Sequence, residues 1–351
     1  MSDSPPAHTP AHAPAQSPPP PQTPPQREQR TQPRNTRKTS YFGVHALSGG
    51  VGSTIAASIT CPLEVVKTRQ QSSLYKEWRE AQRLRLKTPT QKLFSPFITT
   101  GNALAEVYHE GGIRALWRGL GPNLVGVIPA RSIYFGMYGT SKAWLAELNG
   151  REESWVHMVS AAVAGATSAT VTSPIWLVKT RMQLQSGGER QYRNSFHCFQ
   201  SVLKNEGVRG LYKGTSASYL GISESTIQFV LYEWLKKLYR DRRRSEKRPP
   251  TTYFSVQDWV DSFVVAATAK LLASAATYPH EVVRTRLRER PPDGTHSKYN
   301  GLIQTFRVVY REEGFRGLYG GMSTHLIRVV PNAAIMFTVY ELSVYMLGSK
   351  S

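Results

Sequence analysis

The chain has 351 residues, a formal net charge of +20 at pH 7, a pI near 10.0 and a mean hydropathy of −0.37. The basic excess predicts an anionic partner, although the mean hydropathy is that of a soluble protein. Two isolated cysteines exclude a disulfide framework, and the scattered histidines give neither metal-ligand spacing nor a nucleophile with its base, so we expect no metal, no cofactor and no enzyme.

The first segment, residues 1–40, is rich in proline, poor in large apolar side chains and basic toward its end. This composition predicts a disordered basic tail. Its prolines oppose the amphipathic helix of a cleaved presequence, and no apolar secretory core is present. Whether the tail is cleaved stays open.

Three long stretches with few charges each run into a proline motif. Residues 39–63 and 154–178 contain no Asp, Glu, Lys or Arg, and residues 262–280 contain only Lys270. Each is long enough to cross a hydrocarbon core of about 30 Å as a helix. We therefore predict three odd-numbered membrane spans.

Three more stretches, each with a single charge near its middle, alternate with the first three. They are 119–141 around Arg131, 214–232 around Glu224, and 317–340 around Arg328. Many of their residues are Gly, Ala, Ser and Thr, which lowers the hydropathy but lets helix backbones pack closely in lipid. The chain is therefore predicted to be an all-α membrane protein with six transmembrane helices.

Two ordered motifs occur three times. The first reads Pro62-Leu-Glu64-Val-Val-Lys67-Thr-Arg69, Pro174-Ile-Trp176-Leu-Val-Lys179-Thr-Arg181 and Pro279-His-Glu281-Val-Val-Arg284-Thr-Arg286. The second runs from Gly112 to Trp117-Arg118-Gly119, from Glu206-Gly207 to Tyr212-Lys213-Gly214, and from Glu313-Gly314 to Tyr319-Gly320-Gly321. We predict three tandem repeats of about 100 residues, at 41–150, 151–250 and 251–351.

Each motif proline lies within a helical pattern, so it removes a backbone hydrogen bond and should kink its helix. These kinks are predicted at Pro62, Pro174 and Pro279. Beyond each kink, acid and base lie three residues apart on one helix face, where they can reach neighbouring helices. Ion pairs closing one end of the bundle follow from this spacing.

These motifs resemble those of the mitochondrial carrier family, and the resemblance covers residues 41–348. It implies six tilted helices in a barrel with threefold pseudosymmetry, with short helices on the matrix side. A central cavity would open alternately to the two sides of the mitochondrial inner membrane, in which the chain would be a multi-pass protein. We expect a functional monomer, although the sequence leaves the oligomeric state open.

The resemblance further implies a gate at the matrix end. The implied ion pairs are Glu64 with Lys179 and Glu281 with Lys67. A third pair is not expected, because Trp176 stands where the family has an acid and leaves Arg284 without its partner. Gln71 and Gln183 match the bracing glutamines of the family, whereas the third repeat has Arg288.

A second gate is implied at the cytoplasmic end, where the family has an aromatic-acid-x-x-base motif. The matching positions are Tyr138-Gly139 to Lys142, Tyr232-Glu233 to Lys236, and Tyr340-Glu341 to Val344. Two pairs are expected, Lys142 with Glu233 and Lys236 with Glu341. A transporter needs marginal gates, because substrate binding must supply the energy that opens them.

Charges in the middle of a span are costly in a bilayer and usually mark a substrate or ion path. Arg131, Glu224, Lys270 and Arg328 are therefore the site candidates, and three of them are cations. Arginine and lysine side chains suit phosphate groups. They would also bind carboxylates, so charge alone does not identify the substrate. The alternative is interhelical pairing, for instance of Glu224 with Arg131 or Arg328.

Within the family, longer strings resemble the branch that carries pyrimidine nucleotides. They are Cys61 to Arg69, Arg118 to Gly126, Ser216 to Tyr219 with Gly221 to Glu224, and Tyr278 to Arg288. The implied function is exchange of UTP, TTP, CTP and their lower phosphates between cytosol and matrix. Carriers of NAD, folate or flavin nucleotide are the alternative, because they share Pro174-Ile-Trp176.

The resemblance places substrate contacts on the even helices. The implied contacts are Gly126, Leu220, Gly221, Arg328 and Val329. Arg131 and Arg328 are expected to bind phosphates, and Asn123 or Gln228 to read the base edge. Helix packing and capping are equally open as roles for the small and amide residues.

Two other basic stretches, 79–92 and 236–248, are predicted to be solvated loops beside anionic lipid rather than nucleic-acid sites. Cardiolipin binding is implied by the resemblance at helix N-termini near Gly119 or Gly214. A soluble helical-repeat scaffold with a basic surface is the alternative of another class. The long uncharged stretches oppose it.

Overall fold

The structure is a computed structural model that describes residues 36–85, 88, 91, 94–151, 153–185, 191–245, 256–290 and 298–348. Side chains at 36–49, at 256–262 and at several positions near the C-terminal end lie outside this description. The chain forms two units, Met1–Gly43 and Val44–Ser351, and the second unit holds every feature discussed below.

Helices make up the described part of the chain, which contains no strand. The long helices are α1 (Thr36–Gln71), α5 (Leu120–Asn149), α6 (Ser154–Leu184), α8 (Thr215–Ser245), α9 (Val256–Arg288) and α11 (Met322–Gly348). The shorter ones are η1 (Ser73–Tyr75), α2 (Lys76–Arg85), α4 (Ser95–Leu116), α7 (Ser195–Leu211) and α10 (Leu302–Leu318). The predicted all-α fold with six long helices in three repeats is confirmed.

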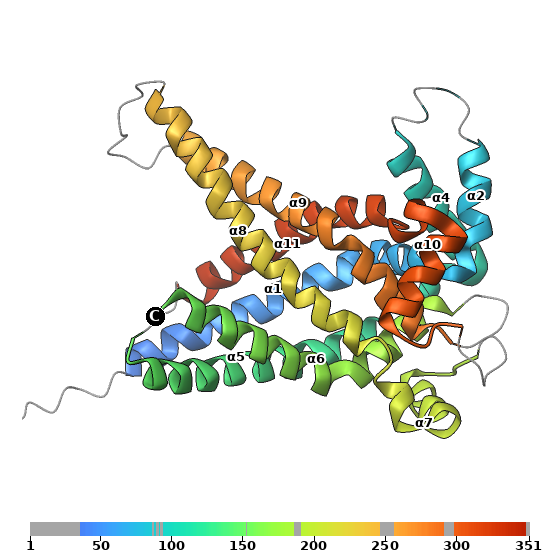
Figure 1. Cartoon of the computed structure of the whole chain (residues 1–351), viewed down its shortest axis with the longest axis horizontal. Coiled ribbons are helices and arrows are strands. Elements are labelled where there is room, and N and C mark those ends of the chain that lie inside the picture. The colour runs from blue at the N-terminus through green and yellow to red at the C-terminus, as the bar shows by residue number, and fades with distance from the viewer. Residues whose placement is uncertain are drawn as a thin grey trace, which may run out of the picture. The chain divides into compact units, whose positions relative to one another are not determined.

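The six long helices alternate in direction (Figure 1). Helices α1, α6 and α9 run toward the end of the bundle where the short helices α4, α7 and α10 lie, and α5, α8 and α11 run back. Helix α5 packs along α6, and α8 packs along α9. We call the end with the proline motifs and the short helices the motif end, and the opposite one the open end.

Each of Pro62, Pro174 and Pro279 lies inside a continuous long helix. The motif that follows each proline therefore stays helical, which keeps its acid and base on one face. The kink predicted at each proline stays a prediction.

By length and composition, α6 is the one described helix that could cross a membrane. Helix α9 carries Lys270 within its span, and the other long helices are rich in small and hydroxyl-bearing residues. The weak hydropathy expected from this composition is thus observed. The six-span fold depends on the threefold repeat rather than on hydropathy alone.

Glycine breaks the short helix in the same way in every repeat. Gly112, Gly207 and Gly314 have φ between +65° and +67°, which an L side chain rarely adopts. In the first repeat an additional residue, Gly111, separates this glycine from the preceding acid, Glu110. The repeated motif thus fixes the turn that returns the chain toward the bundle.

Each repeat has its own small hydrophobic core between its odd long helix and its short helix. In the second repeat, for example, Leu177 and Val178 pack with Cys198, Val202 and Leu211. Equivalent clusters lie around Val65 and around Val283. The first two clusters each lie within one repeat, whereas the third also includes Ala217 of α8 from the second repeat.

Three expectations about connecting segments need correction or lie outside the description. Helix α1 begins at Thr36, inside the last residues of the predicted tail, and residues 1–35 are not described. The basic stretch 79–92, predicted as a loop, is helical as far as Arg85, and 236–248 is helical as far as Ser245. Residues 79–85 and 236–245 contain no proline or glycine, and helices continue where such breakers are absent.

Candidate functional site

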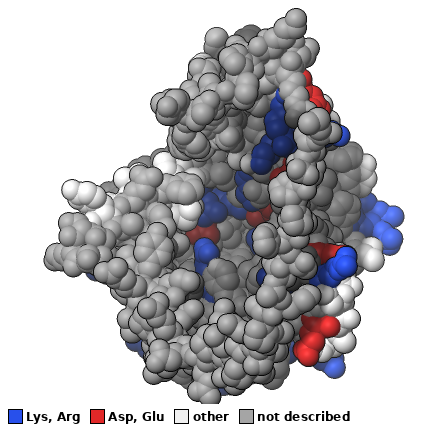
Figure 2. Space-filling view, turned by 90° about the vertical axis from the view of Figure 1, so that its left-hand side faces the viewer, with Lys and Arg blue, Asp and Glu red and all other residues white. Residues whose placement is uncertain are grey.

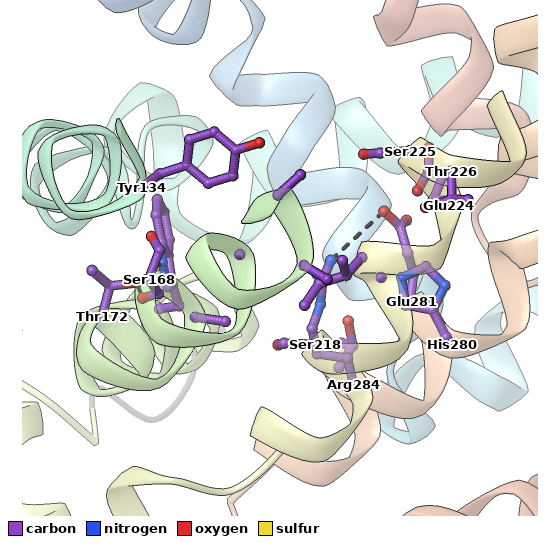
Figure 3. A pocket seen from close by; sticks show the side chains of 18 of the residues that line it. Tyr134, Ser168, Thr172, Ser218, Glu224, Ser225, Thr226, His280, Glu281 and Arg284 are labelled. Carbon is purple, nitrogen blue, oxygen red and sulfur yellow. Dashed lines mark hydrogen bonds and ion pairs between the residues drawn. The ribbon is translucent and has the colours of Figure 1, made fainter. Parts of the chain in front are cut away.

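A cavity of about 1090 Å³ lies between α1, α5, α6, α8 and α9. Seen from the open end, charged side chains of both signs lie inside the hollow (Figure 2). Figure 3 shows Ser168 and Thr172 of α6 across the cavity from Ser218, His280 and Arg284 of α8 and α9. The cavity is therefore polar on opposite walls.

Two ion pairs between repeats close the floor of the cavity at the motif end. The Nζ atom of Lys67 lies 2.5 Å from Oε2 of Glu281, and Nζ of Lys179 lies 2.6 Å from Oε1 of Glu64. All four side chains are at most 16% exposed. The structure thus brings together both pairs that the sequence predicted, and they join α1 to α9 and α1 to α6.

The third pair, between position 176 and Arg284, is absent among the described residues, as the sequence predicted. Trp176 donates its indole N–H to Oγ1 of Thr172, at 2.8 Å, and its ring lies 5.2 Å from Nζ of Lys179. Arg284 reaches Glu281 of its own helix at 3.6 Å. The tryptophan thus supports Lys179 through a cation–π contact but gives Arg284 no carboxylate across the interface.

The bracing positions lie beside these pairs. Gln71 accepts a hydrogen bond from Thr285 at 2.7 Å and donates to the Tyr278 hydroxyl at 2.9 Å. Gln183 accepts from Thr68 at 2.9 Å in the equivalent arrangement. Each glutamine thus ties its own helix to the helix that supplies the acid.

Two expected substrate contacts make packing or hydrogen-bond contacts in this structure. Asn123 is buried and accepts a hydrogen bond from Lys179 at 2.8 Å, so it lies beside the floor pair Lys179–Glu64, and its role in base recognition stays a prediction. A Cβ atom on Gly126 would lie 2.9 Å from a methyl group of Ile175 and 3.5 Å from Trp176. Gly126 thus lets α5 approach α6 closely, which agrees with the role in helix packing that the sequence left open.

Three of the mid-span charges form ion pairs between helices, with partners that the sequence did not indicate. Glu224 accepts from Lys270 at 2.7 Å and from Ser274 at 2.9 Å. Nη1 of Arg328 lies 3.5 Å from Glu64. The suggested partners of Glu224, Arg131 and Arg328, are therefore replaced by Lys270.

Arg131 is exposed and lies on the cavity side of α5. It precedes Tyr134, Phe135 and Tyr138 by three, four and seven residues, and those three side chains line the cavity. This spacing places Arg131 on the same helix face. Its position agrees with the cationic role that we predict.

The remaining expected contacts divide into one that lines the cavity and three that do not. Gly221 lines it, and a Cβ atom there would lie 3.0 Å from Nε2 of His280. In the described part of the chain, Leu220, Gln228 and Val329 are outside the lining, and Leu220 is 45% exposed. On α8 the lining includes Ser218, Gly221, Ile222 and Glu224 but not Leu220.

At the open end, the aromatic side chains of the second gate make contacts within the described residues. The Tyr138 hydroxyl lies 2.8 Å from Nδ1 of His157, and Nζ of Lys236 lies 5.3 Å from the Tyr232 ring centroid. Glu233 is exposed. The side chains of Tyr340 and Glu341 lie outside the description, so the pairs Lys142–Glu233 and Lys236–Glu341 stay predictions.

The last arginine of each proline motif forms a further layer, which the sequence analysis missed. Arg69 pairs with Glu110 at 2.6 Å, Arg286 with Glu313 at 2.7 Å, and Arg181 with Glu206. Each pair lies within one repeat and joins its long helix to its short helix. The triplicate arginine and the triplicate acid before the second motif were the signal that could have revealed it.

The same arginines also donate to the backbone of the next repeat. Arg69 donates to the Gln185 carbonyl at 2.8 Å, Arg181 to the Arg288 carbonyl at 3.1 Å, and Arg286 to the Gln71 carbonyl at 2.7 Å. These carbonyls lie at or just after the ends of α6, α9 and α1, where helix carbonyls lack intrahelical partners. The arginine layer thus has full threefold symmetry.

The charge of Arg181 also affects its partner. Burial alone would raise the pKa of Glu206, but hydrogen bonds and charge from Arg181 and Lys213 hold the pKa below its ordinary value. Glu206 therefore stays ionised at neutral pH. Lys213, the base of the second motif, lies 2.8 Å from this carboxylate.

In the third repeat, the base of the second motif is replaced by Gly320. Its carboxylate, Glu313, is instead contacted at 2.6 Å by Arg79 of α2, which belongs to the first repeat. A Cβ atom on Gly320 would lie 2.9 Å from the Gln70 carbonyl and 3.8 Å from Cζ of Arg79. Arg79 thus occupies the place of the missing basic side chain and links two repeats.

The chain matches the family model described as mitochondrial carrier protein over residues 38–149, 150–243 and 255–351. It is 48% identical to mitochondrial carrier protein rim2 of Schizosaccharomyces pombe, covering 87% of this chain and 90% of that protein. It is 44% identical to the mitochondrial pyrimidine nucleotide transporter RIM2 of Saccharomyces cerevisiae, over 87% and 86% of the two chains. It is also 44% identical to solute carrier family 25 member 36 of Mus musculus, over 87% and 97%. The chain belongs to the mitochondrial carrier family.

Proposed function

We propose that this protein is a multi-pass transporter of the mitochondrial inner membrane that exchanges pyrimidine nucleotides between cytosol and matrix by alternating access. The observation that carries the proposal is a cationic cavity closed at the motif end by Lys67–Glu281 and Lys179–Glu64. The transporter RIM2 of Saccharomyces cerevisiae, 44% identical, is named for pyrimidine nucleotides. The motif end then faces the matrix.

The geometry corresponds to one stage of such a cycle. The cavity is closed by ion pairs at its floor, and Figure 2 shows the hollow from the opposite end. A nucleotide entering from the cytosol would meet Arg131 and Lys270 before reaching the floor. Release to the matrix requires the two pairs to break, and the substrate must bind the rearranged state more tightly to drive that change.

Phosphate recognition is the chemistry that the cavity favours. Arg284 and Arg288 line the cavity, and Lys270 and Arg328 pair with the lining residues Glu224 and Glu64. Arginine donates paired hydrogen bonds to phosphate oxygens. Only binding and release are required of these groups, so we propose transport without covalent chemistry. The protein would act as a monomer, with cardiolipin head groups at the N-termini of α5 and α8 near Gly119 and Gly214.

Counter-exchange in liposomes tests this function. Purified protein is reconstituted with internal UTP, TTP, CTP, ATP, NAD, folate or buffer, and the uptake of labelled UTP is measured. Uptake that depends on internal pyrimidine nucleotide is the expected result. Exchange that responds only to internal NAD or folate would move the assignment to the alternative substrates named from the Pro174-Ile-Trp176 string.

A further inference from the structure

The three interfaces between repeats at the motif end differ in charge. The α1–α9 interface has Lys67 with Glu281, and the α1–α6 interface has Lys179 with Glu64. Each also has a bracing glutamine bonded to a threonine of the neighbouring helix. The α6–α9 interface instead brings Trp176 to a helix that carries two arginines.

Those two arginines, Arg284 and Arg288, lie four residues apart on one face of α9, and both line the cavity. Arg284 pairs at 3.6 Å with Glu281, a carboxylate that Lys67 already holds at 2.5 Å. Arg288 is 6% exposed and donates through Nη2 to the Ser218 hydroxyl at 3.2 Å. Among the described residues, no carboxylate forms an ion pair with Arg288.

Two buried donors in this region have no hydrogen-bond partner in the described structure. They are Nε of Arg288 and Nε2 of Gln183, and both side chains line the cavity. A buried donor without an acceptor costs about 1–3 kcal/mol, and more when it is charged. Together with the guanidinium of Arg284, these groups make the floor rich in donors and poor in acceptors.

An acidic residue at position 176 would have supplied the acceptor. Trp176 directs its N–H to Thr172 of its own helix, and Thr180 donates to the Trp176 carbonyl at 2.8 Å. No described side chain of α6 therefore offers an anion to Arg284. An anionic ligand entering the cavity would find these two guanidiniums without competition from α6.

An arginine of α11 also lies at the level of the floor pairs. Arg328 lies 3.5 Å from Glu64. Lys270 lies roughly 20 Å from Arg284 along α9 at 1.5 Å per residue. The cavity thus has two levels, and the lower one holds the paired lysines Lys67 and Lys179 together with arginines of α9 and α11.

We propose that the floor of the cavity beside α6 and α9 is a phosphate subsite, in which Arg284 and Arg288 bind the terminal phosphates of the nucleotide. This inference depends on the proposed function for the nucleotide, while the phosphate chemistry is common to any phosphorylated ligand. A triphosphate offers more phosphate groups to these cations than a monophosphate does, so its binding depends more strongly on them. The phosphate group takes the role of the carboxylate that the α6–α9 interface lacks.

The test compares substrates that differ only in phosphate number. Full-length protein in liposomes loaded with UTP is assayed for uptake of labelled UTP and UMP, as wild type, Arg284→Gln and Arg288→Gln. Loss of one charge-assisted contact should raise the KM for UTP about tenfold, with a much smaller change for UMP. Lys298→Gln, at an exposed pair with Glu312, is the control and should leave both values unchanged.

A second pair of variants supplies the missing carboxylate. Trp176→Glu should compete with phosphate for Arg284 and raise the KM for UTP, whereas the neutral Trp176→Gln should raise it far less. If the glutamine variants of the arginines do not insert, Arg284→Lys and Arg288→Lys keep the charge, and the Trp176 pair carries the test. An unchanged UTP-to-UMP ratio of KM values in exchanging variants would overturn the subsite.

Binding of inorganic tripolyphosphate separates this inference from the nucleotide assignment. The thermal unfolding of detergent-purified protein is followed with tripolyphosphate or uridine. A rise in melting temperature with tripolyphosphate that Arg284→Gln and Arg288→Gln abolish supports the subsite, even if wild-type protein exchanges no pyrimidine nucleotide. Equal stabilisation of all three proteins would place the anion elsewhere and contradict the proposal.

Discussion

The ion pairs of the cavity and those of the arginine layer beneath it differ in what they connect. Lys67–Glu281, Lys179–Glu64 and Lys270–Glu224 each join two different repeats. The pairs Arg69–Glu110, Arg181–Glu206 and Arg286–Glu313 each stay within one repeat. Under the proposed function, the two pairs between repeats at the cavity floor must break when the cavity opens to the matrix, while pairs within a repeat can persist. The comparison therefore separates the charges that move from the charges that keep each moving part intact.

The arginine layer and the layer of gate pairs at the cavity floor also differ in symmetry. The arginine layer is complete in all three repeats, whereas the gate layer lacks its acid at Trp176. A substitution inside a repeat leaves a buried charge unpaired, which is costly in any state of the transporter. A substitution between repeats also shifts the balance between states, because its pair is present in only one of them. Selective loss of one gate pair is thus compatible with a stable fold.

The largest effect is expected where one carboxylate serves two arginines. Glu313→Gln removes the carboxylate that Arg79 and the fully buried Arg286 share, and Arg286 keeps only a contact of 3.9 Å with Glu289. Breaking such a pair costs about 3–5 kcal/mol. Thermal unfolding in detergent should show a large loss of stability, and uptake should fall with it. The adjacent Glu312→Gln breaks the exposed pair with Lys298 and should cost no more than about 1 kcal/mol.

A cavity cation should affect transport without affecting the fold. Arg328→Ala removes a cation of the cavity floor, and we expect uptake to fall by at least about a hundredfold. Membrane insertion and melting temperature should stay close to those of wild type. Arg328→Lys, which keeps the charge but not the planar fork, should retain partial uptake. Wild-type uptake by Arg328→Ala would remove this residue from the substrate path.

Gate residues should differ among themselves. Lys67→Gln removes the 2.5 Å partner of Glu281, whereas Arg284→Gln removes a contact of 3.6 Å within one helix. We expect the first to lower the stability of the substrate-free protein by about 2 kcal/mol and the second by less than about 1 kcal/mol. The melting temperatures of the two variants without nucleotide measure this difference. Equal losses would show that the third interface carries as much of the gate as the first.

The link between the first and third repeats should have an intermediate strength. Arg79→Ala removes the base that contacts Glu313 from α2, and we expect a loss of about 1–2 kcal/mol, because Arg286 still holds the carboxylate. Lys213→Ala removes the corresponding base of the second repeat and is the matched variant. Chemical denaturation of both proteins should give similar values. A neutral Arg79→Ala would mean that the contact contributes nothing to the folded state.

The smallest effect is expected from pH. Glu206 has a pKa below its ordinary value of 4.5 because hydrogen bonds and charge from Arg181 outweigh the effect of burial. Its contribution to stability is therefore complete above about pH 4.5 and is lost as the pH falls through the lower pKa of the folded state. Glu206→Gln should flatten this part of the stability profile, measured as melting temperature from pH 6 to pH 3.5. A profile identical to that of wild type would contradict the assignment.

Much of the fold could be predicted because the signal was repeated. Pro62, Pro174 and Pro279 fixed the repeat, and the acid and base spacing placed both gate pairs correctly. Cavity contacts that depend on the rotation of a helix were harder to predict from the sequence, as Leu220 and Gln228 show. A shift of a single residue changes the direction of a side chain by about 100°. Asn123 shows a second limit, since its hydrogen bond depends on the position of Lys179 on another helix.

Arg79 shows a third limit. Its contact with Glu313 joins residues separated by more than half of the chain, and no local pattern in α2 indicates it. The substitution of the motif base by Gly320 was visible in the sequence, but only as an omission. The structure shows that Arg79 of α2 takes the place of the missing base, because α2 lies beside α10.

The contact between Arg79 and Glu313 also makes the three seams of the bundle unequal. The seam between the first and third repeats holds Lys67–Glu281, Arg79–Glu313 and the hydrogen bonds from Ser73 to Glu289. The seam between the first and second holds Lys179–Glu64, and the seam between the second and third has no such gate pair among the described residues. Under the proposed function, we therefore expect the matrix end to separate first beside Trp176, where the described residues form no ion pair between α6 and α9.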